Sequence, residues 1–315
     1  MWMLQRASRG VRVLAGASLF AGTVAGISGA SAAAAGPVAG RPGAAAGFIV
    51  RGILSGVAAS SARDAWAVGQ TPVGQVLIVH WNGTAWRRVP GARRGLLGFL
   101  TNVAAISARN AWAVGFTRAG NGILIEHWNG TLWRRVPGAA LPGSSVLSDV
   151  AGTGARDAWA VGWTNTKPAR PVIEHWGGTA WRRVPSPDPV GGGYLFSVAA
   201  TSPRNAWAVG FTGDSAPLIE RWNGTVWRRA PGPLPGRHGL LNDVAATSAG
   251  NAWAVGSAGT LTSQTGTTVI MHWDGTAWRR VPSPASADGR FLVGVAATSA
   301  RSAWAVGFTG SVAQS

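Results

Sequence analysis

The pentapeptide AWAVG occurs six times in this chain, and its copies begin at Ala65, Ala111, Ala158, Ala206, Ala252 and Ala303. Successive copies are 46, 47, 48, 46 and 51 residues apart. A repeat of about 20 to 50 residues is typical of solenoids, propellers and other arrays, in which each unit buries its apolar face against its neighbours. The chain is therefore expected to be a repeat array rather than a single conventional enzyme domain.

A second signature, WNGTAW or a close variant, follows five of the six AWAVG copies. It lies at residues 81–86, 128–133, 176–181, 222–227 and 273–278. The two signatures together contain all but two of the 18 tryptophans, the exceptions being Trp2 and Trp163. Because buried aromatic side chains dominate core energetics, we expect nearly all the tryptophans to be structural.

Each repeat contains four short segments of strand character. In the first repeat they are ILSGVAAS (residues 53–60), AWAVG, VLIVHW (76–81) and TAWRRVP (84–90). No segment has the length and the 3.6-residue period of a helix. Asn-Gly or Asp-Gly lies between the third and fourth segments of four repeats, and Gly177 and Gly178 occupy this place in the third; such pairs favour a type I′ hairpin turn. The predicted fold is an all-β propeller of four-stranded blades, and a β-solenoid is the less favoured alternative.

The repeats are not all complete, because there are six copies of the first two strands but only five copies of the last two. We expect five full blades and a partial sixth. Three explanations remain open: residues 48–52 add a strand that helps to close the sixth blade, the extra strand pair caps a five-bladed ring, or the repeat array is truncated. An unpaired strand edge would invite aggregation, so each explanation must also cover that edge.

The N-terminal residues have the pattern of an export signal. Arg6, Arg9 and Arg12 precede an apolar stretch over residues 13–27, and residues 30–32 form a small-x-small cleavage site. We predict a signal peptide over residues 1–32, a flexible Ala/Gly linker over 33–47 and the repeat domain over 48–315. An uncleaved membrane anchor is the alternative. The expected location is extracellular, either free or associated with the cell wall, and the absence of cysteine excludes a disulfide framework.

The combination of AWAVG with HWNGTAW and VPSP resembles the tryptophan-rich propeller repeats of many secreted actinobacterial proteins, over residues 53–309. It is more distantly similar to the Asp-box repeats of sialidases and to photosystem II assembly factor propellers. The Asp-box has its aspartate two residues before the glycine, whereas Asn82 and Asp274 here directly precede Gly83 and Gly275. The sialidase resemblance implies a tyrosine nucleophile, for which Tyr194 is the only candidate.

The acidic residues and histidines follow the repeat instead of gathering at one site. Eight of the eleven carboxylates occupy repeat positions, and Asp188, Asp214 and Asp288 lie in variable segments of different repeats. Glycoside hydrolysis needs two carboxylates about 5 to 10 Å apart, and the sequence shows no such pair. Four histidines directly precede a repeat tryptophan, namely His80, His127, His175 and His272, and packing explains them better than metal binding. We predict no catalysis, no cofactor and no metal site.

Paired arginines are the strongest charge signal in a chain whose formal net charge is +17. One pair lies in the last segment of every full repeat: Arg87 and Arg88, Arg134 and Arg135, Arg182 and Arg183, Arg228 and Arg229, Arg279 and Arg280. A basic outer wall of this kind favours an anionic glycan, a cell-wall polymer or a protein partner, with nucleic acid less favoured. The alternative is that these arginines only guard exposed strand edges.

A second candidate surface follows from strand direction. The second-to-third and fourth-to-first connections vary in length, and alternating strands place both on one face, where recognition usually resides. The candidate residues on this loop face are Arg93, Arg94, Arg118, Trp163, Lys167, Arg170, Tyr194, Arg237, His238 and Arg290. The expected protein is a monomeric, secreted, non-catalytic binding or scaffold module. A sialidase-like glycan hydrolase and an inactive truncated repeat protein are the alternatives.

Overall fold

The computed structural model describes residues 50–118, 122–141, 144–233, 238–259, 267–283 and 290–309, together with the backbone of residues 11–15. Every regular element in these ranges is a β-strand. The predicted all-β propeller is confirmed, because four-stranded antiparallel sheets repeat along the chain. The described residues contain no helix long and apolar enough to span a bilayer. Apart from residues 11–15, the predicted signal peptide and linker lie outside the described residues.

Five sheets have four strands each, joined in sequence order, and we number these blades 1 to 5. The first strands, including that of the partial blade 6, are β2 (Ile53–Ser61), β6 (Gly98–Ser107), β10 (Ser145–Gly154), β14 (Gly193–Ser202), β18 (Gly239–Ser248) and β22 (Arg290–Ser299). The second strands are β3 (Asp64–Gln70), β7 (Asn110–Thr117), β11 (Asp157–Thr164), β15 (Asn205–Thr212), β19 (Asn251–Ala258) and β23 (Ser302–Thr309). The third strands are β4 (Val76–Trp81), β8 (Ile123–Trp128), β12 (Pro171–Trp176), β16 (Pro217–Trp222) and β20 (Thr267–Trp273). The fourth strands are short: β5 (Trp86–Arg88), β9 (Trp133–Arg135), β13 (Trp181–Arg183), β17 (Trp227–Arg229) and β21 (Trp278–Arg280).

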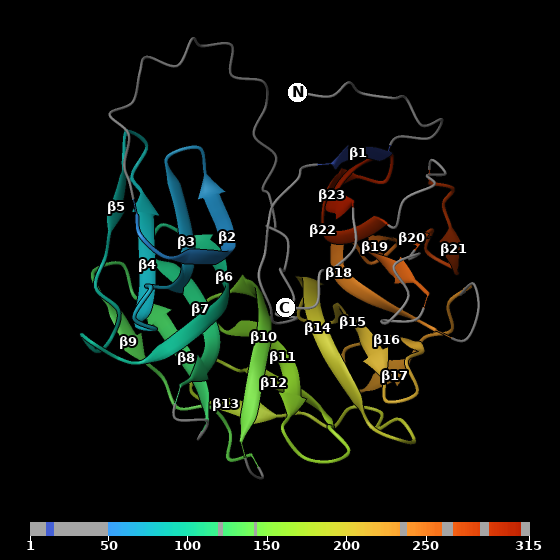
Figure 1. The fold of residues 1–315 in the computed structure, drawn as a ribbon, viewed down its shortest axis with the longest axis horizontal. Helices are drawn as coiled ribbons and strands as arrows, with labels where there is room; N and C mark the ends of the chain where they lie inside the picture. Colours follow the sequence, from blue (N-terminus) through green and yellow to red (C-terminus); the bar gives the residue numbers. More distant parts are fainter. Residues whose placement is uncertain are drawn as a thin grey trace.

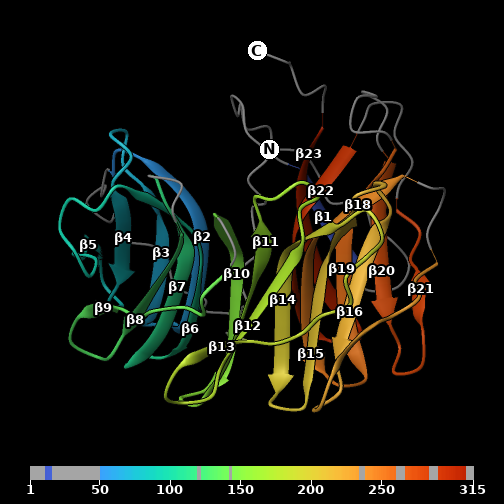
Figure 2. The same ribbon diagram turned by 90° about the horizontal axis from the view of Figure 1, so that it is seen from below.

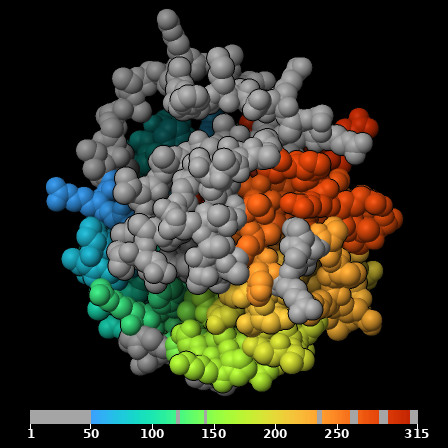
Figure 3. Space-filling view, turned by 45° about the vertical axis from the view of Figure 1, so that its right-hand side comes forward, coloured from blue at the N-terminus to red at the C-terminus, as the bar shows by residue number. Residues whose placement is uncertain are grey.

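The blades follow one another around a ring in sequence order, as the colours of Figures 1 and 3 show. Figure 2 shows the same blades side by side after a quarter turn. Each first strand packs against the first strand of the next blade, from β2 to β6 and onward to β22. No comparable packing joins β22 to β2 in the described part of the chain, so the ring stays open on that side.

Blade 6 contains β22 and β23, and the backbone segment β1 (Val11–Ala15) pairs in parallel with β23. This sheet therefore has three strands, in agreement with the expected partial sixth blade. The suggestion that residues 48–52 add a strand is wrong for the described residues 50–52, which precede β2 and belong to no strand. Residues 48 and 49 lie outside the described ranges.

The third and fourth strands are joined by a four-residue loop, not by the predicted type I′ turn. Type I′ needs positive φ at both central residues. In blade 1 only Gly83 meets this condition, with φ of 93°, and Asn82 does not. Instead, Asn82 Oδ1 accepts hydrogen bonds from the backbone N–H groups of Thr84 and Ala85, both at 3.0 Å. The side chain of the asparagine thus closes the loop, as in an Asx-turn.

Apolar side chains of neighbouring blades form one cluster for each blade interface. Between blades 1 and 2, Trp66 and Val68 of β3 pack with Leu100 and Val103 of β6. The same repeat positions meet at the other four interfaces. Since AWAVG places alanine between these large side chains, the second strand can lie buried on both faces.

Each first strand also carries a bulge, and in four of the six strands the bulged residue is polar and bonds to the next blade. The register of β6 shifts between Leu100 and Asn102, which leaves Thr101 without a partner. Thr101 Oγ1 donates to the backbone oxygen of Leu147 in the next blade at 2.8 Å. Ser55, Ser148 and Asn242 make the corresponding bonds to Leu100, Leu195 and Leu292 at 2.5, 2.8 and 2.7 Å. Polar side chains at the bulges therefore fix the spacing of successive blades.

Candidate functional site

The histidines of the third strands are packed against tryptophan rings. His80 lies 4.0 Å from the ring of Trp66, centroid to centroid, and its Nε2 is 2.7 Å from Asp64 Oδ1. His127, His175 and His272 repeat this stack and bond to Asn110, Asp157 and Asn251 at 2.8, 2.8 and 2.7 Å. Burial lowers the pKa of His127 and of His272. The geometry assigns these histidines a packing role within each blade.

Five of the six AWAVG tryptophans are buried at blade interfaces, and Trp304 of the partial blade 6 is half-buried. Trp159 meets Trp222 and Trp227 of the next blade at centroid distances of 4.9 and 5.2 Å, the second in an edge-on arrangement. Trp66, Trp112 and Trp207 make the same pair of contacts. These rings belong to the scaffold.

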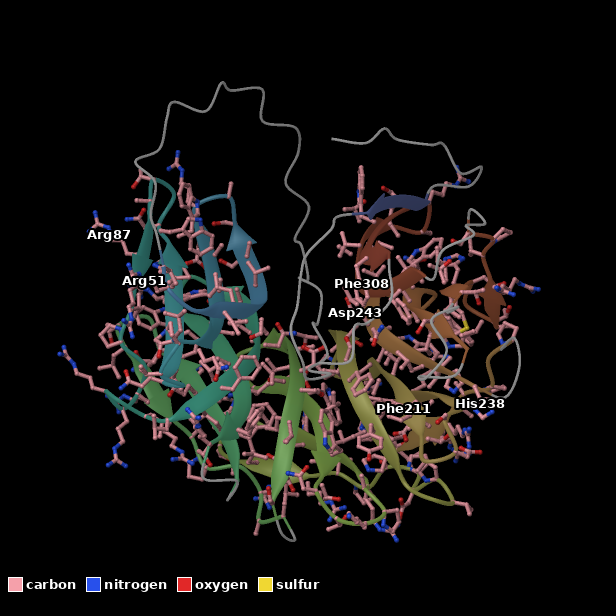
Figure 4. All side chains as sticks on the ribbon, in the orientation of Figure 1. Arg51, Arg87, Phe211, His238, Asp243 and Phe308 are labelled. Atoms are coloured by element: carbon pink, nitrogen blue, oxygen red, sulfur yellow. The ribbon has the colours of Figure 1, made fainter. Side chains whose placement is uncertain are left out.

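All ten paired arginines lie exposed on the fourth strands, where they form the surface that we call the outer wall. Figure 4 labels Arg87 at the outer side of blade 1 and Asp243 near the middle of the ring. Of these ten arginines, only Arg279 has a carboxylate of the described residues within ion-pair distance, that of Asp274 at 2.5 Å. The outer wall is therefore a largely uncompensated band of positive charge.

Blade 4 departs from the histidine pattern and has a cavity at its outer side. Arg221 occupies the histidine position, and its guanidinium carbon lies 5.0 Å from the ring centroids of both Trp207 and Trp273. The cavity has a volume of about 490 Å³ and lies between blades 4 and 5. Its lining includes Arg221, Arg228, Ala230 and Trp278.

Three buried glutamates occupy one position of the third strands, in blades 2, 3 and 4. Ala92 N donates to Glu126 Oε2 at 3.0 Å and Ala139 N donates to Glu174 Oε2 at 3.2 Å, which ties the linker before each blade to that blade. Burial raises the pKa of all three, that of Glu174 to about 7 and that of Glu220 to about 8. Such shifts also occur at catalytic acids. Here each glutamate lies in a different blade and faces no second carboxylate.

A second set of buried carboxylates lies on the first strands. The residue before the conserved valine of each first strand is Gly56, Asn102, Asp149, Ser197, Asp243 or Gly294. The four polar members are buried and hydrogen-bonded from blade to blade, and we call them the polar belt. Asn102 Nδ2 donates to Asp149 Oδ1. Val198 N and Val295 N donate to the carboxylates of the preceding blades, Asp149 and Asp243, at 2.8 and 2.7 Å.

Ser197 lies between the two aspartates of the polar belt. Its Oγ is 2.8 Å from Asp149 Oδ2 and 2.6 Å from Asp243 Oδ1, but the hydroxyl has a single proton to donate. One carboxyl group must therefore carry a proton for both contacts to be hydrogen bonds. Burial raises the pKa of both carboxyl groups, that of Asp149 to about 6 and that of Asp243 to about 7. Each also accepts backbone N–H bonds, Asp149 from Val150 and Val198 and Asp243 from Val244 and Val295. The two carboxyl groups therefore hold one proton between them.

The variable connections lie side by side on one face, as strand alternation predicts. Gly98 N donates to Gly74 O at 2.9 Å, and Gly239 N donates to Ser215 O at 2.8 Å, so each bond joins a fourth-to-first connection with a second-to-third connection. Arg93, Arg94 and Arg118 are exposed there. His238 is also exposed, and its backbone oxygen accepts a bond from Gly259 N at 3.2 Å.

The aromatic candidates of the loop face pack on one another. Trp163 meets Tyr194 and Phe196 at centroid distances of 5.6 and 5.7 Å, and Tyr194 stacks on Phe211 at 4.6 Å. Trp163 occupies the strand position of Phe116 and Phe211 in other blades. These rings form an additional aromatic cluster that joins blades 3 and 4.

The remaining loop-face candidates do not gather at one point. Lys167 is exposed, and Arg170 forms an ion pair with Asp188. Arg237 and the side chain of Arg290 lie outside the described residues. The search of the described residues found no group of three or more histidines and carboxylates able to hold a metal ion.

The comparisons with known proteins concern the fold. The structure of YCF48 bound to a D1 peptide matches with a TM-score of 0.55 at 15% identity, covering 81% of this chain and 75% of the other. The structure of the fucose-specific lectin of Aleuria aurantia matches with a TM-score of 0.51 at 13% identity, covering 77% of this chain and 83% of the lectin. These likenesses show a shared propeller fold. The structure of a xyloglucanase of Xanthomonas campestris matches with a TM-score of 0.54 at 18% identity, covering 78% of this chain but only 40% of the enzyme. No family model and no curated protein matches the sequence.

The polar belt and the blade 4 cavity were not foreseen from the sequence. Asp149 and Asp243 are two of the eight carboxylates at repeat positions, and Arg221 replaces the repeat histidine in blade 4. The sequence signal for the belt was a polar residue directly before the valine that recurs in each first strand. The signal for the cavity was that one repeat differs from the others at two positions, Arg221 in place of histidine and Ala230 in place of valine.

Proposed function

We propose that this propeller is a secreted, non-catalytic binding module that holds an anionic polymer against its outer wall. The observation that carries the proposal is the band of ten exposed arginines, of which only Arg279 has an ion-pair partner among the described residues. Polyanions bind such bands largely by releasing counterions. A cell-wall or capsular glycan is the favoured polymer for an exported protein.

Two neighbours with propeller folds bind partners by their printed names: the Aleuria aurantia lectin is fucose-specific, and YCF48 was solved with a peptide. Both support a binding role without identifying the ligand. The burial of the acids supports the absence of catalysis, since the described carboxylates with a pKa raised to about 6 or above all lie buried within the blades. Incubation with sialosides and cell-wall glycans should release no sugar.

The test compares dextran sulfate with unmodified dextran at low and at high salt, using the full chain. Replacing the first arginine of all five pairs by glutamine should weaken dextran sulfate binding by about 100-fold at low salt and flatten its salt dependence. The control variant replaces Arg93, Arg94 and Arg118 by glutamine on the loop face. Equal losses in both variants, or binding of neutral dextran, would contradict the outer wall as the contact surface.

Export is tested separately. Expression of the full sequence in a secreting host should yield an extracellular product whose N-terminus is Ala33. A retained product with an intact N-terminus would support the membrane-anchor alternative. Sedimentation of the mature product should show a monomer.

A further inference from the structure

The cavity between blades 4 and 5 exists because two residues of blade 4 differ from the repeat. Arg221 stands where blades 1, 2, 3 and 5 have histidine, and Ala230 stands where they have valine: Val89, Val136, Val184 and Val281. Both residues line the cavity. The shorter alanine leaves room that valine would fill, so the same blade both opens the space and adds a cation to it.

Arg221 is held in place with one N–H group unused. Its guanidinium lies between the rings of Trp207 and Trp273. Its Nη2 donates to Ala249 O at 3.3 Å and to Asn205 Oδ1 at 3.5 Å. The Nε group is buried and has no hydrogen-bond partner among the described residues. A buried N–H without an acceptor is costly, so the protein alone leaves this guanidinium incompletely satisfied.

The charge around Arg221 is also uncompensated. Arg221 lies directly opposite Arg228 in the β16–β17 pair, whereas each other blade sets histidine opposite this arginine. Like charges directly opposite one another destabilise a strand pair. The side chain that faces Arg221 is Asn205, where blades 1 and 3 have an aspartate, and no carboxylate lines the cavity. Glu220 precedes Arg221 and so points to the opposite face of the strand.

We propose that this cavity binds the carboxylate of an acidic sugar, a hexuronic acid unit within the polymer that the outer wall attracts. This inference rests on the proposed function and adds a specific site to it. Arginine forks bind carboxylates in bidentate geometry, which suits the Arg221 and Arg228 pair. The lining residues Pro231, Pro233 and Trp278 offer an apolar surface to the pyranose ring. The volume of about 490 Å³ fits a small ligand.

Calorimetric titration of the full chain with trigalacturonate, and with maltotriose as the neutral probe, tests the site. Trigalacturonate should bind saturably and maltotriose should not. Arg221→His and Ala230→Val each restore the residue of the other blades, and each should weaken trigalacturonate binding about tenfold or more. Arg228→Ala should do the same, while a control on the loop face, Arg93→Ala, should bind like the parent. Tryptophan fluorescence checks that each variant is folded.

The outcomes separate this site from the outer wall. If the parent binds dextran sulfate but not trigalacturonate, the site is overturned and the proposed function stands. Binding of trigalacturonate by Arg221→His and Ala230→Val with parental affinity would overturn the site too. If inorganic polyphosphate and trigalacturonate bind equally well, and Arg221→His changes neither affinity, both anions bind the outer wall through unspecific charge attraction and the site is overturned. If the parent does not bind dextran sulfate, the proposed function itself is overturned.

Discussion

Leu54 and Leu195 occupy the same position of the repeat but differ in burial. Leu195, in the interior of the array, is 0% exposed, whereas Leu54, in the first blade, is 46% exposed. At the other end, Val306 of blade 6 is 45% exposed and its equivalent Val209 is 0% exposed. The repeat makes both faces of every blade apolar, and only a neighbouring blade buries them. Burial in this array is therefore set by position along the ring as much as by sequence.

The largest expected effect follows from this comparison. Leu195→Ala should lower the free energy of unfolding by about 2–5 kcal/mol, because it leaves a cavity in a closed blade interface. Leu54→Ala removes the same atoms from a surface that is already half in water, and should cost about 0.5 kcal/mol or less. Urea unfolding followed by tryptophan fluorescence measures both. Similar losses in the two variants would show that Leu54 is covered in solution.

The polar belt also distinguishes interior from ends. Its members lie in blades 2 to 5, and the equivalent residues of blades 1 and 6 are Gly56 and Gly294. A side chain on the belt bonds to the following blade, as Asp149 does with Val198 and Asp243 with Val295. The glycine of blade 1 lies against the belt, because a Cβ added at Gly56 would clash with Asn102 of blade 2.

Protonation of the belt predicts a pH dependence of stability. Burial raises the pKa of Asp243 from 3.8 to about 7, so folding favours its protonated form. That stability is fully present below about pH 4 and is lost as the pH rises through 7. Between pH 5 and pH 8 the shift of Asp243 alone should lower the free energy of unfolding by about 2–4 kcal/mol. Glu174 and Glu220, whose pKa values are raised to about 7 and about 8, contribute with the same sign.

Asp243→Asn isolates the contribution of the belt, because the amide does not ionise in this range. The fall between pH 5 and pH 8 should become smaller, whatever the absolute stability of the variant. The control is Asp214→Asn: Asp214 is exposed, and its pKa is lowered chiefly by the Thr212 hydroxyl, so it stays ionised throughout. An unchanged slope in Asp243→Asn would mean that Asp243 does not share the proton of the belt.

The sequence predicted the local features of this propeller well. The strand positions followed from the alternation around AWAVG and HWNGTAW, and the exposed arginines followed from their place in the fourth strand. The fourth strand itself is shorter than the predicted segment: in blade 1 residues 84–90 were expected and Trp86–Arg88 is found. Its first residues form the loop that Asn82 closes.

Features that depend on two blades were harder to predict. Asn102, Asp149, Ser197 and Asp243 differ in side-chain type, so their common role became visible only when adjacent first strands were placed together. The type I′ turn was wrong because the pair Asn-Gly does not reveal that the asparagine side chain accepts bonds from the loop. Arg221 and Ala230 are nine residues apart, and only the hairpin brings them to one cavity.

The smallest expected effect concerns the loop between the third and fourth strands, which forms within a single blade and needs no neighbouring blade. Asn82 in end blade 1 and Asn129 in interior blade 2 accept the same two backbone bonds, from Thr84 and Ala85 at 3.0 Å and from Thr131 and Leu132 at 3.0 and 3.1 Å. Asn82→Ala and Asn129→Ala should each cost about 1 kcal/mol of unfolding free energy, because each leaves two exposed N–H groups to water. Urea unfolding should show equal losses within error. A markedly larger loss for Asn129→Ala would mean that hairpin closure, too, depends on the flanking blades, and that the local and the neighbour-dependent parts of this fold are not separable.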